Sequence, residues 1–232
     1  QGMESWLSLL RGRGPFPSGE LFRSGGIYVY RGEAPEECPR CGSERGRYHI
    51  HGGFLRWLRT LVDGRIQRIR LRKPRFLCLA CQKTFSQNPP DVLPYKRTSS
   101  FLIVLCLWSY LVSPLGIHRC LPGAVSEDIS AKTLARHLKA AKAVAGETQQ
   151  FIREVLIRKM EPRPVEELFP GGLDPPETLR RKRLKEPDTA WTLWRALHML
   201  RQGADVLSID PRTLLAWAQE SEHGKSRPFL LS

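Results

Sequence analysis

The sequence predicts an α+β fold, in which a small three-stranded sheet, clamped at one end, is followed by an all-α bundle. Four of the six cysteines stand in two C-x-x-C pairs, Cys38 with Cys41 and Cys78 with Cys81. Doubled C-x-x-C turns are the ligand pattern of a structural zinc site. Beyond residue 98, long apolar and amphipathic stretches are typical of helices. The pattern therefore predicts a zinc ribbon followed by a helix-turn-helix-like bundle.

Composition divides the chain into five segments. They are a leader at 3–36, the zinc ribbon at 37–97, a helix-turn-helix-like helical domain at 98–160, a linker at 161–188 and C-terminal helices at 189–232. In the leader, a short helix is expected over Glu4–Leu10 and a strand over Ile27–Tyr30, which leads into the first cysteine pair. Neither element indicates a function.

The ribbon segment contains the signals of a long hairpin. Strands are expected over Arg47–Leu61 and Arg65–Leu77. Asp63-Gly64 between them is a strong hairpin-turn signal, because both turn positions favour positive φ. A third short strand is expected over Lys83–Ser86.

The four paired cysteines fill a tetrahedral shell, so one structural zinc ion is expected. No ligand position is left open for water, which excludes a catalytic role for that ion. The alternative is two unrelated pairs of buried or redox-active thiols. Cys106 and Cys120 belong to no pair and are expected to be buried core thiols.

Helical patterns fill the next segment. Helices are expected at Ser99–Val112, near Leu115–Leu121, at Ala131–Ala145 and at Glu147–Met160. Ser130 is a good N-cap for the basic third helix, and three helices ending in a capped basic one indicate a helix-turn-helix unit. The connection between 122 and 129 is longer than in the compact form of that motif.

The rest of the chain predicts a linker and two more helices. Residues 161–188 hold six prolines and 13 charged residues, the composition of a linker. Its basic run Arg180–Lys185 is either a solvated face or an extra phosphate contact. Helices are expected over Trp191–Gln202 and Pro211–Glu220, the second with Asp210 as its N-cap.

The net charge of +14 is concentrated on the ribbon, since residues 37–100 carry 14 basic and 4 acidic side chains. Such a focused field indicates a polyanion, most simply nucleic acid. The acidic residues are scattered and do not converge as two-metal catalysis requires, so an enzyme is not expected. Unpaired cysteines and the absence of a long apolar run indicate a cytoplasmic, nucleoid-associated protein without membrane contact.

Several short sequence motifs in the first half of the chain are fairly specific when taken together. They are Cys38-Pro39-Arg40-Cys41-Gly42-Ser43, His51-Gly52, the run from Pro74 to Ser86, and Leu93-Pro94-Tyr95-Lys96-Arg97. Over about residues 28–145 the chain resembles the zinc-ribbon plus helix-turn-helix DNA-binding region of bacterial insertion-sequence transposases, and a related uncharacterised bacterial domain family. In such families a ribonuclease-H-type catalytic domain follows. The roughly 70 residues after Met160 are too few for that domain, so the resemblance implies the DNA-binding half without the catalytic domain.

The first functional hypothesis is a zinc-stabilised protein that binds double-stranded DNA, as a transposase-related regulator or an accessory factor of a mobile element. Phosphate contacts are expected from basic residues of the hairpin and of the segment behind it: Arg56, Arg59, Arg65, Arg68, Arg70, Arg72, Lys73, Arg75, Lys96 and Arg97. Strand alternation places Arg68, Arg70 and Arg72 on one face.

Base reading is expected from the helix that Ser130 caps. Its candidates are Lys132, Thr133, Arg136, His137 and Lys139. Leu134 and Leu138 are expected to pack on the apolar helix, so that Lys132, Arg136 and His137 face outward. The alternative for this helix is a merely solvated polar face.

The alternative function is an RNA- or single-strand-binding zinc-ribbon adaptor that acts with a protein partner through its C-terminal helices. Exposed rings on the hairpin would stack on bases. The candidate rings are Tyr48, His49, His51, Phe54 and Trp57. Packing within the small ribbon is the expected fate of each ring.

Overall fold

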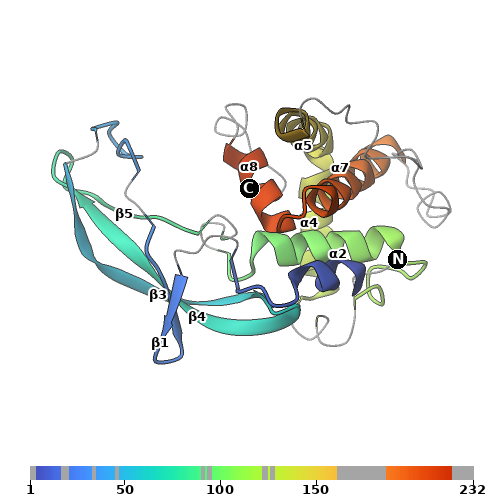
Figure 1. The fold of residues 1–232 in the computed structure, drawn as a ribbon, viewed down its shortest axis with the longest axis horizontal. Coiled ribbons are helices and arrows are strands. Elements are labelled where there is room, and N and C mark those ends of the chain that lie inside the picture. Colours follow the sequence, from blue (N-terminus) through green and yellow to red (C-terminus); the bar gives the residue numbers. More distant parts are fainter. Residues whose placement is uncertain are drawn as a thin grey trace.

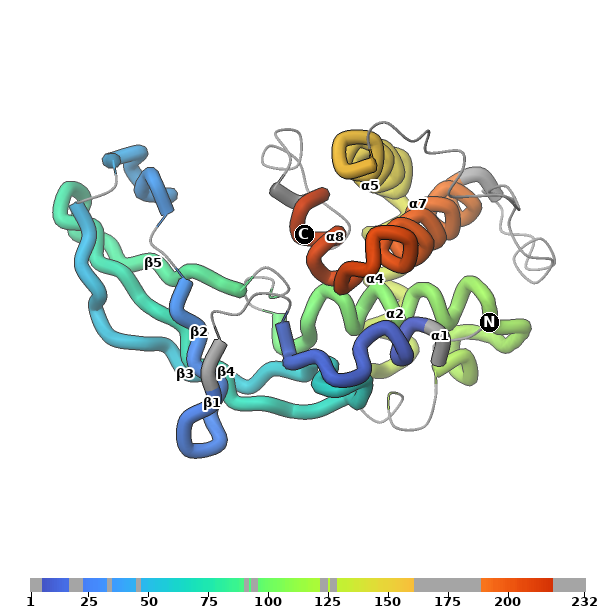
Figure 2. Tube along the Cα trace, viewed as in Figure 1, coloured from blue at the N-terminus to red at the C-terminus, as the bar shows by residue number. Residues whose placement is uncertain are grey.

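The computed structural model describes residues 4–16, 21–32, 35–44, 47–89, 92, 96–121, 125, 129–160 and 187–220. These residues form a curved β arm and a helical body (Figures 1 and 2). The strands of the arm are β1 (Leu21–Ser24), β2 (Ile27–Tyr30), β3 (Tyr48–Val62), β4 (Arg65–Cys78) and β5 (Thr84–Ser86). The helices of the body are α1 (Glu4–Leu7), the 3-10 helix η1 (Ser8–Leu10), α2 (Ser100–Val112), α4 (Ala131–Ala143), α5 (Ala145–Met160), α7 (Pro187–Val206) and α8 (Pro211–Glu220). The α+β class is confirmed.

The antiparallel pair of β3 and β4 is the backbone of the arm. It runs from Tyr48 opposite Cys78 to Val62 opposite Arg65. The turn has φ of 51° at Asp63 and 68° at Gly64, so the two-residue turn is confirmed. The register shifts between Ile50 and Gly53, where Gly52 has a φ of 81°. Two residues of β3 therefore face one residue of β4, which is a β-bulge that bends the strand.

The sheet contains five strands, two more than the sequence predicts for the ribbon. Its order is β1-β2-β4-β3, and β5 also pairs with β4. The leader supplies the extra strands: β2 lies parallel to β4, and β1 lies antiparallel to β2. The turn between them has positive φ at Gly25 and Gly26. That Gly-Gly pair is a hairpin signal, so a local pattern for β1 was present in the sequence.

The body is built around α2, which lies at its centre (Figure 1). Eleven of its 13 residues are buried, as expected of a helix that is apolar on all sides. Trp6 from the leader packs edge-on against Phe101 and Trp108, with ring centroids 5.5 and 5.7 Å apart. Trp108 in turn stacks on Trp194 of α7 at 6.2 Å. One apolar core thus contains residues from the leader, α2, α4, α5, α7 and α8.

Most expected helices are present, with shifted ends. Ser99 and Ser130 each accept a hydrogen bond from a backbone N–H of the first turn, so both cap the helices that follow them. Residues 115–121 form bends and turns, not the short helix that the sequence predicts. The linker expected at 161–188 lies outside the described residues up to 186, and with it the run Arg180–Lys185. No helix of the described part of the chain could cross a membrane.

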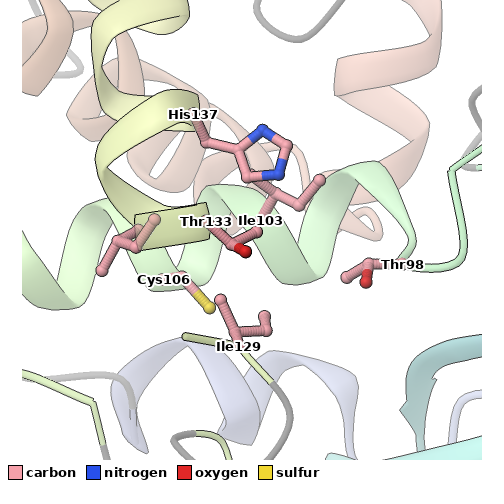
Figure 3. Close-up of a pocket in the computed structure, with 7 residues that line it drawn as sticks. Thr98, Ile103, Cys106, Ile129, Thr133 and His137 are labelled. Carbon is pink, nitrogen blue, oxygen red and sulfur yellow. The ribbon is translucent and has the colours of Figure 1, made fainter. Parts of the chain in front are cut away.

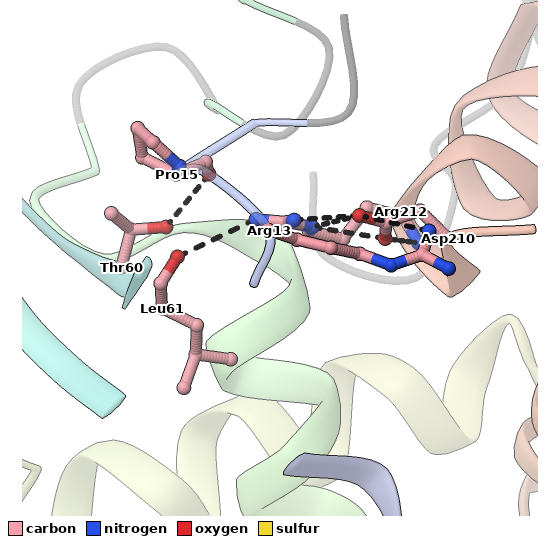
Figure 4. A network of polar contacts seen from close by, with 6 residues as sticks. All are labelled: Arg13, Pro15, Thr60, Leu61, Asp210 and Arg212. Carbon is pink, nitrogen blue, oxygen red and sulfur yellow. Dashed lines mark hydrogen bonds and ion pairs between the residues drawn. The ribbon is translucent and has the colours of Figure 1, made fainter. Parts of the chain in front are cut away.

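The hairpin turn docks on the body through hydrogen bonds to the leader. The Asp63 N–H donates to the Arg13 carbonyl at 2.8 Å, and the Gly12 N–H donates to the Asp63 Oδ1 atom at 2.6 Å. Next to the turn, the Thr60 hydroxyl donates to the Pro15 carbonyl at 3.3 Å (Figure 4). The proximal end of the arm is therefore fixed, while the end with the cysteines projects away from the body (Figure 1).

A buried ion pair completes this joint (Figure 4). Arg212 is 2% exposed, and its guanidinium donates to both carboxylate oxygens of Asp210. Its Nη1 atom also donates to the carbonyl of Leu61 on β3 at 3.4 Å. The Arg13 guanidinium lies 3.8 Å from Asp210. The start of α8 is thereby bonded to the base of the arm.

Candidate functional site

The four predicted metal ligands meet at the distal end of the arm. The sulfurs of Cys38, Cys41, Cys78 and Cys81 all lie within 4.8 Å of one another. The Sγ atoms of Cys38 and Cys81 are 4.0 Å apart, and those of Cys41 and Cys78 are 3.8 Å apart. In a tetrahedral site with Zn–S bonds of about 2.3 Å, neighbouring sulfurs lie about 3.8 Å apart. The geometry is that of a structural metal site with four thiolate ligands.

The two C-x-x-C turns that position the sulfurs have matching backbones. The residue after each second cysteine has a positive φ, 69° at Gly42 and 55° at Gln82. In the first turn the Gly42 N–H donates to the Cys38 carbonyl at 2.9 Å, and the Arg40 N–H points at the Cys38 sulfur at 3.4 Å. Only Gly adopts positive φ without strain, so the second turn carries a cost that the first turn avoids.

Ser43 tunes the thiols electrostatically. Its hydroxyl lies 3.2 Å from the sulfur of Cys78 and 3.3 Å from that of Cys41. The hydrogen bond with Ser43 is the main reason that the pKa of Cys78 is lowered to about 6, and it also lowers the pKa of Cys41. For Cys81 the backbone hydrogen bond of Lys83 acts to lower the pKa, but burial and the three neighbouring sulfurs raise it to about 11.

These shifts indicate what the shell requires. The hydrogen bonds of Ser43 favour the thiolate forms of Cys78 and Cys41, whereas burial and the neighbouring sulfurs oppose ionisation of Cys81. A bound metal ion supplies the positive charge that lets all four thiols ionise. The set therefore fits a metal ion whose role is to hold the two turns together.

Aromatic side chains support the sulfur cluster from the sheet side. Tyr48 lies edge-on to Phe85 with ring centroids 5.4 Å apart, and Phe85 stacks on Phe76 at 5.6 Å. The Tyr48 hydroxyl donates to the carbonyl of Ser43 at 3.0 Å. The pKa of Tyr48 is raised by burial and then by the neighbouring Cys38. Tyr48 thus packs within the ribbon, as the sequence predicts.

The basic residues of the hairpin are divided between the two faces of the ribbon. Opposite pairs in the register are Arg59 with Arg68, Trp57 with Arg70 and Leu55 with Arg72. We call the set Trp57, Arg59, Arg68, Arg70 and Arg72 the arginine face. The next residues along each strand point to the other side, and there Leu58, Ile69 and Leu71 are buried.

Arg68, Arg70 and Arg72 of the arginine face are exposed. Among the described residues no carboxylate forms an ion pair with Arg68, Arg70 or Arg72. The guanidinium of Arg68 lies 4.6 Å from the ring centroid of Trp57, and that of Arg70 lies 5.8 Å from it. Trp57 itself is 47% exposed. The prediction that the Trp57 ring packs within the ribbon is therefore wrong. The same prediction is wrong for Phe54, which is 49% exposed.

A groove on the arm is lined by residues of β3, β4 and β5 and by others near them. We call it the basic groove. It has a volume of about 870 Å3. Its lining includes the basic residues Arg40, Arg56, Lys73, Arg75 and Arg97. Lys73 is only 8% exposed, and its ammonium donates to the Asn88 Oδ1 atom at 2.6 Å. Burial lowers the pKa of Lys73, and the neighbouring Arg56 lowers it further.

The capped helix α4 presents only part of its predicted set to solvent. Lys132, Arg136 and Lys139 are exposed. Thr133 and His137 instead line a small pocket of about 40 Å3 with Ile103 of α2 (Figure 3). The expectation that His137 faces outward is wrong, because it follows the buried Leu134 by three positions and shares its side of the helix.

The two titratable side chains that line this pocket, His137 and Cys106, are held in their neutral forms. Burial lowers the pKa of His137, and Lys96 and Arg136 lower it further. Burial also raises the pKa of Cys106 to about 12. A neutral thiol of this kind is a poor nucleophile, so the proximity of Cys106 and His137 carries no catalytic arrangement.

Two of the predicted phosphate contacts lie outside the arginine face and the basic groove. Three residues that contribute to the sites were not predicted from the sequence. Arg65 is exposed beside the hairpin turn, and Lys96 is exposed just before α2. Ser43, Arg40 and Asn88 contribute to the sulfur cluster or the basic groove. The position of Ser43 directly after the first C-x-x-C turn was a usable signal. Arg40 and Asn88 gave none, because only the folded arm brings them near Lys73.

Comparisons of the chain with protein-family models, with curated proteins and with solved structures find no significant match. The transposase likeness stays a prediction from motif spelling.

Proposed function

We propose that the protein binds double-stranded DNA through a zinc-stabilised β arm, as a transposase-related regulator or accessory factor of a mobile element. The observation that carries this proposal is the arginine face, on which Arg68, Arg70, Arg72 and Trp57 are exposed. Arg68, Arg70 and Arg72 within it form no ion pair among the described residues. Positive side chains held close together without carboxylate partners favour the binding of a polyanion. When they neutralise DNA phosphates, the salt cations condensed on the DNA are released, which favours binding.

The shape of the arm supports duplex DNA. β-Strands can lie in the major groove of DNA, and β3 and β4 form an antiparallel pair 15 and 14 residues long, which β2 and β5 widen along β4. In this proposal the four cysteines hold one zinc ion, so that β3, β4 and β5 form a zinc ribbon. The ion acts as a structural clamp and takes no part in chemistry.

Helix α4 is proposed as a second contact, in a helix-turn-helix-like arrangement with α2. The exposed stripe of Lys132, Arg136 and Lys139 supports this role. The Arg136 guanidinium hydrogen-bonds the Thr133 hydroxyl at 3.4 Å, so it must swing free to reach a base. Base selection by Arg136 would show in a selection from random duplexes, where Arg136→Ala relaxes the preference at one position.

The experiment that tests duplex binding compares two variants with the same loss of charge. Arg68→Gln with Arg70→Gln removes two charges from the arginine face, and Arg153→Gln with Arg158→Gln removes two from α5. Duplex affinity is measured across a salt series. The first variant should reduce the slope of log K against log salt by about 0.9 for each lost phosphate contact, and the second should leave it unchanged. Equal slopes in all three proteins would contradict the proposal.

A further inference from the structure

The basic groove is a second charged surface of the arm, which meets the arginine face at Trp57. Its lining contains five basic side chains and no acidic one. Lys73 and Arg72 are neighbours in β4, and strand alternation directs them to opposite sides of the ribbon. Lys73 lines the groove, whereas Arg72 is absent from the lining and lies over Gly53. The basic side chains of the two surfaces therefore differ, and Trp57 borders both.

The groove is organised for an anion. An ammonium has three donors, and the Lys73 ammonium makes one hydrogen bond to a side chain, to Asn88. Arg56 lies close enough to lower the pKa of Lys73, and Arg97 lowers that of Arg56 after burial has done so. Cations that repel one another in a partly buried site are stabilised by a bound negative charge.

The groove also contains exposed aromatic surface. Phe54 is 49% exposed, and the Lys73 ammonium lies 5.5 Å from its ring centroid. Phe85 lines the same groove. Basic side chains that follow a backbone beside rings that stack on bases are the common features of single-strand binding. A duplex is instead read by an element that enters its own groove.

We propose that the basic groove binds a single-stranded segment of nucleic acid, with Lys73 and Arg56 at a phosphodiester and Phe54 beneath a base. This inference rests on the proposed function, because it assumes that nucleic acid is the partner of the arm. It adds a second site for unpaired strands, so that one arm holds duplex on its arginine face and single strand in its groove.

The test measures binding of labelled oligothymidine, oligouridine and a duplex to the full-length, metal-loaded protein. Phe54→Ala should weaken single-strand binding about 5- to 150-fold, the range for the loss of one stacked base. Lys73→Gln should also weaken it, and Phe54→Ala should keep duplex affinity within about twofold. Arg72→Gln is the matched control, which should weaken duplex binding and spare the single strand. The ratio of oligothymidine to oligouridine affinity shows whether DNA or RNA is preferred.

The outcomes separate this inference from the proposed function. If Phe54→Ala leaves single-strand binding unchanged while the arginine face still governs duplex binding, the groove inference is wrong and the proposed function stands. If single strands bind in a Phe54-dependent way and duplex does not bind, the groove inference stands and the proposed duplex binding is wrong. Since the Phe54 side chain is exposed, its removal should preserve the fold, and circular dichroism with metal content checks this. Failure of every nucleic acid to bind would overturn both.

Discussion

The helical body and the distal β arm are each stabilised by a different physical means. The body has one continuous apolar core, in which 34 side chains are buried. The arm has a smaller core of six buried residues near its base. Beyond that core, all residues of β3 from His49 to Leu55 are exposed. The short strand β5 pairs with β4 there, and Phe76 is buried beside it. A sheet this small is marginally stable in water, so the distal arm needs another source of stability.

That source is the sulfur cluster, with the aromatic side chains that flank it. The arm exposes charge and rings along much of its length. The difference indicates a division of labour: the body supplies a rigid base, and the sulfur cluster joins the distal ends of an extended, basic arm.

The largest effect is expected from Cys78→Ser. This change removes a ligand from the shell, so the metal should be lost and residues 48–57 and 72–86 should lose their ordered structure. Cys106→Ser is the matched control in the body, and it should keep the full metal content. Metal analysis and far-UV circular dichroism measure both effects. If Cys78→Ser retains a bound metal with an ordered arm, the arm does not depend on the metal.

The next effect concerns the joint between the two regions. Asp210→Ala leaves the Arg212 guanidinium buried without its carboxylate, which should lower the free energy of unfolding by about 3–5 kcal/mol. Arg13→Ala removes the more exposed partner of Asp210 and should cost less than about 1 kcal/mol. Urea denaturation measures both. Similar costs for the two variants would show that the buried pair does not stabilise the joint.

A smaller effect separates the two C-x-x-C turns. Gly42→Ala forces a side chain into positive φ where the surrounding space is open, so it should cost about 1–2 kcal/mol from the backbone alone. Gln82→Gly relieves the same strain but loses the hydrogen bond from the Gln82 side chain to the Leu79 carbonyl. It should therefore change stability by less than about 1 kcal/mol. Chelator competition measures both, and a larger loss for Gln82→Gly would contradict this assignment.

The smallest effect is a pH dependence that belongs to the body. Burial lowers the pKa of His137 and of His198 below the ordinary value of 6.5. The unfolded chain therefore takes up protons first, and stability falls as the pH drops below 6.5. The free energy of unfolding of chelator-treated protein is measured between about pH 8 and pH 5. His137→Gln should flatten the curve, and an unchanged curve would show that His137 does not contribute.

Local signals in the sequence were sufficient for the long hairpin and the cysteine cluster of the arm. Asp63-Gly64 fixed the hairpin turn, because few other pairs accept positive φ at both positions. The cysteine spacing located the candidate metal site for the same reason, since each turn places two sulfurs together without help from distant residues. The caps Ser99 and Ser130 were likewise readable from short patterns.

Contacts between distant segments were not readable. Trp6 gave no sign that it packs on Phe101 and Trp108, because the leader and α2 meet only in the folded chain. The pocket that turns His137 inward depends on how α4 sits on α2 (Figure 3). The basic groove is a third example, since it joins β3 and β4 to residues beyond β5.

The contrast between a metal-held arm and a core-held body is tested most directly by amide hydrogen exchange on metal-loaded and chelator-treated protein. Chelation should abolish protection in the distal halves of β3 and β4 and in β5, because their hydrogen bonds lose the clamp. Amides of α2, α5 and α7 should keep their protection. Unchanged protection in the distal strands, or a loss that spreads equally to α2, would contradict the division between the two regions.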